Sequence, residues 1–437
     1  MSWLNFFQTT HKQHHTFGRG INANISPNEE ELFLQSFQKF ENGAILEAYE
    51  LFFKSLLNYT DEICNNNIIL QKEEDTLHFT LLQGCATITG VITQQNLYAE
   101  AIIVTKEFAN VALKRYLLER NYQLTYANYF ADEEMIKIKL YHDNITMSPQ
   151  KVFFPLREIA LNADFDREYL KSEFKDIVLP QTEHLTPLPQ EELEIKYSFM
   201  QEEISRVEAK ILTLPSNDNT SMQSFLYLNL LFEIDYLIVP KQKIYQQLSK
   251  RILDYFSEKE LPMEARNEEL RRYIEKLKSL TLQEFSSNFY EAKYTFNPTE
   301  KSNFEDVVAF INDSLGKVRW YKNNRYAQII PTIYRYIAFY ILYNYGLNPA
   351  ARELLHILVE VQNGDFFERL GYATLYDEEK NSFAKRTIIS RINTIIDSYV
   401  AHYPALESFA SELNFGSLNE FSNSFYLLFA NLNFEEI

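Results

Sequence analysis

Residues 76–104 read TLHFTLLQGCATITGVITQQNLYAEAIIV, and this stretch decides the fold of the first part of the chain. At its start Leu77, Phe79 and Leu81 are apolar, while the residues between them are polar. The rest of the stretch is rich in β-branched residues, which favour strands. Together with the apolar residues from Ile68 onward, the pattern predicts a meander of three or four antiparallel strands.

Two helices are predicted before this meander. The segment SPNEEELFLQSFQKF (26–40) opens with Ser26 as an N-cap, Pro27 at the first helical position and three glutamates in the first turn. An Asn42-Gly43 turn leads into AILEAYELFFKSLLNY, so the two helices should form a hairpin. The second helix is similar to half of a tetratricopeptide unit, but it occurs once, and such units need about three copies to bury their faces.

After the meander the spacing becomes helical and then alternates again. The segment EFANVALKRYLLERNY predicts a helix with Val111, Leu113, Leu117 and Leu118 as its apolar residues. The segments YQLTYANYF and EMIKIKLY then predict a β-hairpin. In the second strand apolar residues alternate with two lysines, which predicts one buried and one solvated face of the sheet.

Pro155 lies inside a stretch with helical spacing, MSPQKVFFPLREIALNADF (147–165). Proline in a helix interior removes a backbone hydrogen bond and clashes with the preceding turn. We therefore predict a short turn at Ser148-Pro149 and a main helix that starts at or near Pro155 and packs across the sheet. The alternative is a single kinked helix from Pro149.

This order of elements resembles the type III secretion chaperone-like fold, in particular the YbjN-like proteins. The stretches that carry the resemblance are LYAEAIIVTKEFANVALKRYLLERNYQLTYANYFADEEMIKIKLYHDN (97–144) and MSPQKVFFPLREIALNADFDREYLKSEF (147–174). The resemblance covers residues 29–175, about a third of the chain. It implies a non-enzymatic role, because the chaperones dimerise and hold unfolded segments of secreted partners, while YbjN-like proteins have regulatory roles. The family has no functional motif, so no site residue is carried over.

A proline-rich stretch, DIVLPQTEHLTPLPQEE, marks a domain boundary, and helical spacing continues after it. The predicted fold class is α+β: an antiparallel sheet with helices, followed by an all-α helical domain. The predicted divisions are a tail (1–28), an α+β chaperone-like domain (29–176), a proline-rich linker (177–190) and an all-α domain (191–437).

Composition and charge exclude several classes of function. The net charge of −18 disfavours nucleic acid as a partner, and 10 glycines in 437 residues argue against glycine-rich phosphate loops. The N-terminus has neither the charge nor the apolar run of a signal peptide. The Tyr-rich segment YAQIIPTIYRYIAFYILYNYG (326–346) has too short an apolar run to span a membrane and is interpreted as a core helix. These features predict a cytoplasmic protein without a membrane partner.

Glu233 is the strongest candidate for an unusual carboxylate. It lies in the apolar segment LYLNLLFEIDYLIV with Asp235, and its helical spacing turns it inward. A buried carboxylate is either paired or protonated, and such a group can act as a catalytic acid. A structural pair with Arg319, Arg325 or Arg335 is the favoured interpretation.

Three other motifs are weaker. His11 and His15 have a spacing that can bind zinc, with His14 beside them, but the segment is interpreted as a mobile tail without a second shell. Cys64 and Cys85 lack ligand or disulfide-framework spacing. Cys85 is a candidate nucleophile, but it lies in a predicted strand beside Gly84, where a cysteine is ordinarily buried. A buried, unreactive Cys85 is therefore the favoured interpretation.

The segment GKVRWYKNNRYAQ (316–328) interleaves aromatic residues with Arg319, Lys322 and Arg325. Aromatic residues beside cations are one signature of nucleic-acid binding. Because the chain as a whole is acidic, we interpret the segment as an inter-helix loop whose arginines pair with carboxylates.

The sequence thus favours a non-catalytic protein-interaction module, chaperone- or adaptor-like, with a protein partner. Whether the chain also forms a homodimer through the N-terminal domain is left open. A second hypothesis is a small-molecule-binding sensory or regulatory protein with an aromatic pocket around Tyr334, Tyr340 and Tyr343. An enzyme built around Glu233 is the third. The sequence assigns no catalytic, cofactor-binding or metal-binding residue, and it implies no cofactor.

Overall fold

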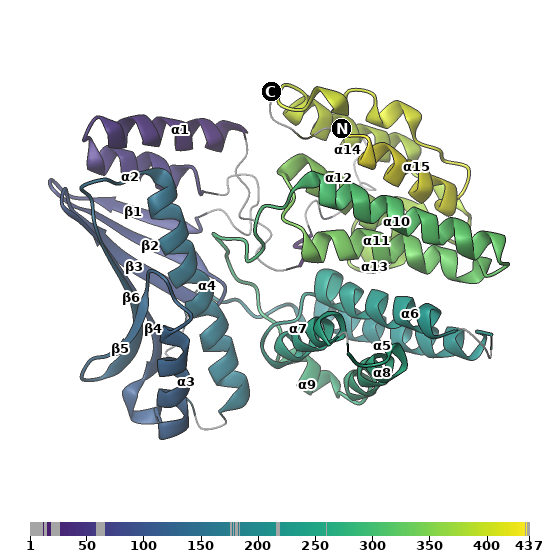
Figure 1. Cartoon of the computed structure of the whole chain (residues 1–437), viewed down its shortest axis with the longest axis horizontal. Helices are drawn as coiled ribbons and strands as arrows, with labels where there is room; N and C mark the ends of the chain where they lie inside the picture. The colour runs from purple at the N-terminus through teal and green to yellow at the C-terminus, as the bar shows by residue number, and fades with distance from the viewer. Residues whose placement is uncertain are drawn as a thin grey trace, which may run out of the picture.

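The computed structural model of the chain describes residues 12, 15–18, 27–57, 66–174, 177, 179, 182, 184–215, 219–258, 260–432 and 434. Its first part is an antiparallel six-stranded sheet with helices, and its second part is largely helical. Figure 1 shows the two parts side by side. We call residues 27–174 the α+β region and residues 190–432 the helical region.

The α+β region contains, in chain order, α1 (Pro27–Glu41), α2 (Ile45–Lys54), β1 (Ile68–Lys72), β2 (Leu77–Gln83), β3 (Ala86–Ile92), β4 (Asn96–Thr105), the 3-10 turn η2 (Lys106–Phe108), α3 (Val111–Asn121), β5 (Asn128–Ala131), β6 (Met135–Asp143) and α4 (Pro149–Glu173). The strands pair antiparallel in the order β1-β2-β3-β4-β6-β5. The predicted helical hairpin, meander and β-hairpin are confirmed. Ser26, the predicted N-cap of α1, lies outside the described residues.

One face of the sheet is buried and the other is partly solvated. On β6, Ile136, Ile138 and Leu140 are buried, and the lysines between them are half-buried. Lys137 forms an ion pair with Glu100 of β4 on the outer face, with an N–O distance of 2.9 Å. The alternation predicted for β6 is confirmed. Helix α4 crosses the buried face (Figure 1), so its apolar side closes the core of the α+β region.

The prediction that the main helix starts at Pro155 is wrong. Helix α4 is continuous from Pro149, its N-cap is Ser148, and Pro155 lies inside it. Proline at this position removes the one backbone hydrogen bond that the Lys151 carbonyl would accept. Pro155 and Ile159 are both buried against the sheet, and burial of this face stabilises the helix more than one lost bond destabilises it.

Helix α3 forms as its helical spacing predicted, but its apolar residues differ in exposure. Leu113 and Leu117 are buried, whereas Val111 is 67% exposed and Leu118 is 62% exposed. The apolar residues of α3 therefore occupy two faces, because only the side of the helix that faces the sheet has a neighbour to pack against.

The helical region contains α5 (Gln190–Leu212), α6 (Thr220–Glu233), a π-helical turn η3 (Ile234–Ile238), α7 (Gln242–Ser257), α8 (Met263–Lys278), α9 (Leu282–Ser286), α10 (Phe304–Asn323), η4 (Ala327–Ile329), α11 (Ile330–Asn344), α12 (Pro349–Gln362), α13 (Gly364–Arg369), β7 (Tyr376–Asp377), β8 (Ser382–Phe383), α14 (Lys385–Tyr399), η5 (Pro404–Leu406), η6 (Phe409–Glu412) and α15 (Leu418–Ala430). The expectation of a purely α domain is wrong at β7 and β8. These strands are too short to produce an alternating pattern, and a cross-strand ring pair, Tyr376 with Phe383 at 4.7 Å, holds them together.

The Tyr-rich segment forms α11, whose central residues Ile333, Ile337 and Phe339 are fully buried. It is therefore a core helix, as predicted. Within the described ranges, every helix is too short or too polar to cross a membrane.

The helical region inserts an extended segment, residues 293–298, into the α+β region, and we call it the clasp segment. Phe296 is fully buried in the core of the sheet, with its ring centroid 5.3 Å from that of Phe153 on α4. The side chain of Gln83, at the end of β2, accepts hydrogen bonds from the backbone N–H groups of Thr295 (3.1 Å) and Phe296 (2.8 Å). Its amide group also donates to the Phe296 carbonyl at 3.2 Å.

Further polar contacts hold both ends of the clasp segment. The Gly84 backbone N–H donates to the Lys293 carbonyl at 2.8 Å. At the other end the guanidinium of Arg157 on α4 donates to the carbonyls of Asn297 (3.0 Å) and Pro298 (3.1 Å). The two regions therefore share one core at this point, although the clasp segment follows the proline-rich stretch by about a hundred residues.

Replacing Phe296 with alanine should lower the free energy of unfolding by about 3–5 kcal/mol, because it leaves a cavity in the sheet core. Chemical denaturation followed by circular dichroism measures this loss. Phe154→Ala on α4 is the matched control: its ring is 49% exposed, and its cost should stay below about 1 kcal/mol. Equal costs for the two variants would contradict the role assigned to the clasp segment.

Candidate functional site

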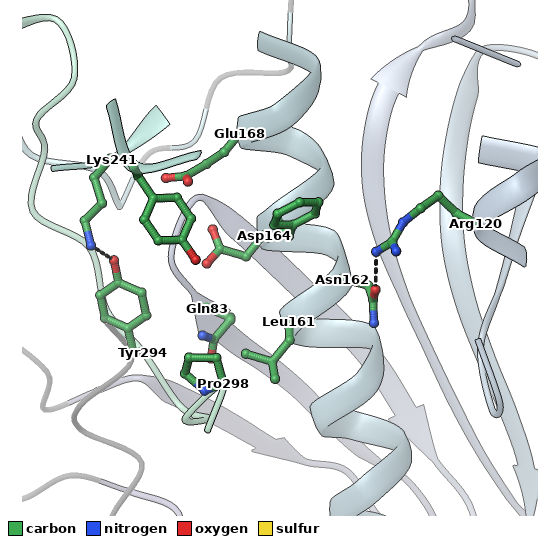
Figure 2. Close-up of a pocket in the computed structure, with 11 residues that line it drawn as sticks. Gln83, Arg120, Leu161, Asn162, Asp164, Glu168, Lys241, Tyr294 and Pro298 are labelled. Carbon is green, nitrogen blue, oxygen red and sulfur yellow. Dashed lines mark hydrogen bonds between the residues drawn. The ribbon is translucent and has the colours of Figure 1, made fainter. Parts of the chain in front are cut away.

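A pocket of about 350 Å³ opens where α4 meets the helical region, and we call it the joint pocket. Its volume lies within the range of small-molecule sites. Figure 2 shows its residues, which come from β2, α3, α4, the start of α7 and the clasp segment. The polar side chains that line it include Gln83, Asp164, Glu168, Lys241, Tyr245 and Tyr294.

Asp164 packs against the turn between β2 and β3. A Cβ added to Gly84 would lie 2.1 Å from both carboxylate oxygens of Asp164, and Gly84 has a φ of +53°. Only glycine allows both this close approach of the Asp164 carboxylate and a backbone with positive φ. The Asp164 Oδ1 atom accepts a hydrogen bond from the Cys85 backbone N–H at 2.7 Å. The prediction that Cys85 lies in a strand is wrong, because it occupies the second position of this two-residue turn.

Glu168 lies one turn further along α4 and is buried. Its Oε1 atom accepts a hydrogen bond of 2.5 Å from the Tyr290 hydroxyl group. Across the pocket the Lys241 amine donates to the Tyr294 hydroxyl group and lies 4.6 Å from the centroid of the Tyr294 ring. Asp164 and Glu168 thus extend from one side of α4 toward Lys241 and Tyr294 (Figure 2).

Burial dominates the electrostatics of the joint pocket. It raises the pKa of Asp164 to about 7, and repulsion from Glu168 adds to the shift, while the Cys85 N–H and Lys241 oppose it. Burial, followed by the charge of Asp164, also raises the pKa of the Cys85 thiol well above its ordinary range. Cys85 is therefore a neutral thiol near neutral pH and a poor nucleophile. The arrangement favours proton exchange and polar binding over nucleophilic chemistry.

Within the part of the chain that it describes, the structure gives no cluster of the side chains that commonly bind metal ions. No three side chains among histidine, cysteine, aspartate and glutamate come together there in a way that could hold a metal ion.

Glu233 is buried, with 1% of its surface exposed, as its spacing predicted. Of the three candidate arginines, Arg335 on α11 is the partner, at 3.5 Å from Glu233 Oε1. Burial, followed by repulsion from Glu203, raises the pKa of Glu233 to about 7, and Arg335 opposes this shift. Asp235 is buried in the π-helical turn after α6. The structure thus provides the ion pair of the favoured interpretation.

The segment 316–328 is not an inter-helix loop in its first half. Residues 316–323 form the last two turns of α10, and Arg319 and Arg325 are both exposed. Of the aromatic residues in the segment, Tyr321 is buried and Trp320 is 54% exposed. Tyr321 therefore lies on the face of α10 that contacts the core, and Trp320 lies with Arg319 on the face toward solvent.

His15 does not lie in a mobile tail, and this prediction is wrong for residues 15–18. The His15 imidazole is half-buried in the helical region, with Nε2 3.2 Å from the Leu237 carbonyl. Phe17 next to it is buried and stacks on His356 at 4.1 Å. Burial lowers the pKa of His15 to about 3, so the ring is neutral. His11 and His14, like Cys64, lie outside the described residues.

Tyr334, Tyr340 and Tyr343 pack against other rings of the helical region. Tyr334 stacks on Tyr426, Tyr340 stacks on Phe310 at 4.2 Å, and the ring centroid of Tyr343 lies 4.9 Å from that of Phe232. A separate pocket of about 360 Å³ lies beside them, and none of the three lines it. We call it the aromatic pocket. Its aromatic residues are Phe225, Tyr255, Phe256, Trp320, Tyr321 and Tyr336.

No protein-family model and no curated protein matches this sequence. The functional argument therefore rests on geometry. Sequence reasoning missed Asp164, Glu168 and Lys241. The only signal in the sequence was that Asp164 and Glu168 lie four residues apart on a helix that was predicted to pack across the sheet. Nothing in the sequence indicates that Lys241 lies opposite them.

Replacing Glu233 with glutamine should change how stability depends on pH. The pKa of Glu233 is about 7 in the folded chain, and its ordinary value is 4.5. Between these two pH values the folded state therefore binds more protons than the unfolded state. The free energy of unfolding therefore falls as pH rises through this window. Because glutamine does not titrate, the variant should gain roughly 1–3 kcal/mol relative to the native chain between about pH 5 and about pH 8.

Denaturation series across this pH range measure the difference. Glu407→Gln removes an exposed carboxylate and serves as the control, with no pH-dependent gain expected. A difference between Glu233→Gln and the native chain that stays constant with pH would mean that Glu233 is ionised throughout.

Proposed function

We propose that this protein is a non-catalytic protein-interaction module of the chaperone or adaptor kind. The observation that carries the proposal is a row of exposed apolar side chains on α3 and at its C-cap residue, Tyr122. Val111, Leu118 and Tyr122 follow each other at helical spacing on one face, and Tyr122 is 93% exposed. Exposed apolar residues that line up in this way are typical of interaction surfaces. We call these three residues the α3 stripe.

The occupant that fits the α3 stripe best is a second copy of this chain. Arg115 and Glu119 are exposed along one flank of the stripe. When two α3 helices pack antiparallel about a two-fold axis, equal flanks meet, and Arg115 of one copy lies opposite Glu119 of the other. The surface is thus complementary to itself in its apolar part and along the flank formed by Arg115 and Glu119.

The order of elements supports a chaperone-like role for the α+β region. Two helices, a four-strand meander, a helix, a hairpin and a closing helix follow one another, as in the type III secretion chaperone-like, YbjN-like family that the sequence resembles. Strand β1 lies at an edge of the sheet, and its residue Ile69 is 49% exposed. An edge strand of this kind can pair with an extended segment of a partner.

Light scattering coupled to size exclusion tests the second-copy proposal. The native chain should show twice the 51.7 kDa mass of one copy. Val111→Lys combined with Leu118→Lys should give a monomer that keeps the native circular dichroism spectrum, because both side chains are exposed and do not contribute to the core of one copy. Leu253→Lys is the control variant. Leu253 lies on α7, outside the α3 stripe, and is 66% exposed, so this variant should remain a dimer.

A charge exchange sharpens this test. Arg115→Glu should weaken the dimer by about tenfold or more, and adding Glu119→Arg should restore it. A native chain that remains monomeric at high concentration, or a dimer that survives the double lysine variant, would contradict the proposal.

The second candidate function is the binding of a small molecule by a sensory or regulatory protein, which the aromatic pocket favours. Its wall contains Trp320, which is 54% exposed, and the sequence has two tryptophans in all. In a Trp3→Phe background, a flat aromatic compound that enters the pocket should change the fluorescence of Trp320. Loss of this change in Phe225→Lys, with native stability retained, would support the site, and an unchanged response would contradict it.

A further inference from the structure

We propose that the joint pocket binds a small organic molecule through its protonated primary amine, held between the carboxylates of Asp164 and Glu168. This proposal is independent of the α3 stripe and of the aromatic pocket. It rests on the geometry of α4, of the clasp segment and of the start of α7, which together enclose the space shown in Figure 2.

The first argument is charge. Asp164 and Glu168 lie four residues apart on α4, so they occupy consecutive turns of one helical face and point into the same space. Of the pocket's two basic residues, Arg120 lies on the other side of α4, where it binds Asp166 and Asn162. The two carboxylates therefore face a single lysine across the pocket, and the lining has an excess of negative charge.

The second argument is hydrogen-bonding capacity. An ionised carboxylate has about four acceptor positions, and an ammonium group offers three donors. Asp164 accepts from the Cys85 N–H, and Glu168 accepts from the Tyr290 hydroxyl group. Both carboxylates thus retain acceptor positions for a ligand, and a single ammonium group can donate to both.

The third argument is the apolar part of the wall. Leu161, Phe165 and Pro298 line the same pocket of about 350 Å³. This volume and lining suit an alkyl or aralkyl group attached to the amine. A strongly hydrated inorganic cation would leave these apolar surfaces without a partner. The chemical class that fits the joint pocket is therefore a primary amine with a compact apolar body.

Proton binding at Asp164 supports this assignment. The pKa of Asp164 is raised to about 7 by burial and by Glu168, so a proton on Asp164 relieves the repulsion between the two carboxylates. An ammonium ligand would replace that proton, and binding should strengthen as pH rises through this range. The titratable groups that face Asp164 are Glu168 on α4, Cys85 in the turn, Lys241 and Tyr245 at the start of α7, and Tyr290 and Tyr294 around the clasp segment.

The test uses the full chain with matched pairs of probes. Butylamine, hexylamine and phenethylamine are compared with the alcohols of the same carbon skeletons, each at about 10 mM, by thermal unfolding at about pH 6 and about pH 8. We expect at least one amine to raise the melting temperature in a concentration-dependent manner, and more so at the higher pH. The matched alcohol should have no effect. Calorimetry in buffers of different ionisation enthalpy should show proton release at about pH 6.

Asp164→Asn and Glu168→Gln should each weaken amine binding by about tenfold or more. The asparagine can still accept the Cys85 N–H, so the turn should be retained, and circular dichroism with the melting temperature of the unliganded variants checks this. Glu47→Gln removes an exposed carboxylate on α2 and should bind amines as the native chain does. The proposal is overturned if no amine binds, if the alcohols act as the amines do, or if both pocket variants retain native affinity.

Discussion

The carboxamide of Gln83 is the interaction on which the rest of this structure depends. It lies at the end of β2, is buried, and exchanges hydrogen bonds with the backbone of Thr295 and Phe296 as a neighbouring strand would. Buried backbone groups without partners destabilise a fold strongly. By satisfying these groups, Gln83 fixes the clasp segment, and the clasp segment places Phe296 in the sheet core and Tyr294 in the joint pocket.

Much of the fold could be predicted because periodicity is a local property. Alternation identified the strands from Ile68 to Asp143, and helical spacing identified the helices that follow. The prediction about Pro155 was wrong because the destabilising effect of proline in a helix competes with burial against the sheet, and the pattern of residues 147–165 does not show how strong that burial is. The clasp segment could not be predicted, since KYTFNP has no periodicity and its partners on β2 and α4 lie more than a hundred residues earlier.

The residues of the candidate sites also divide into those that local spacing could reveal and those whose role depends on distant contacts. Glu233 could be placed inward from its own helix, and Arg335 was among three arginines considered. Asp164 and Glu168 drew no attention, because their significance depends on Lys241 and Tyr290, which reach them only through the contact between the two regions. His15 was missed for a related reason: its environment is built by helices more than two hundred residues away.

The position of the clasp segment in the chain has a consequence for synthesis on the ribosome. All six strands and α4 leave the exit tunnel before residue 296 is made, so for the time needed to add about 120 residues the sheet core lacks one of its aromatic rings. During that interval the Gln83 carboxamide and the Phe153 ring lack the partners that the clasp segment provides. The α+β region therefore reaches its final packing only after much of the helical region has been translated, which makes its maturation a late, non-local event.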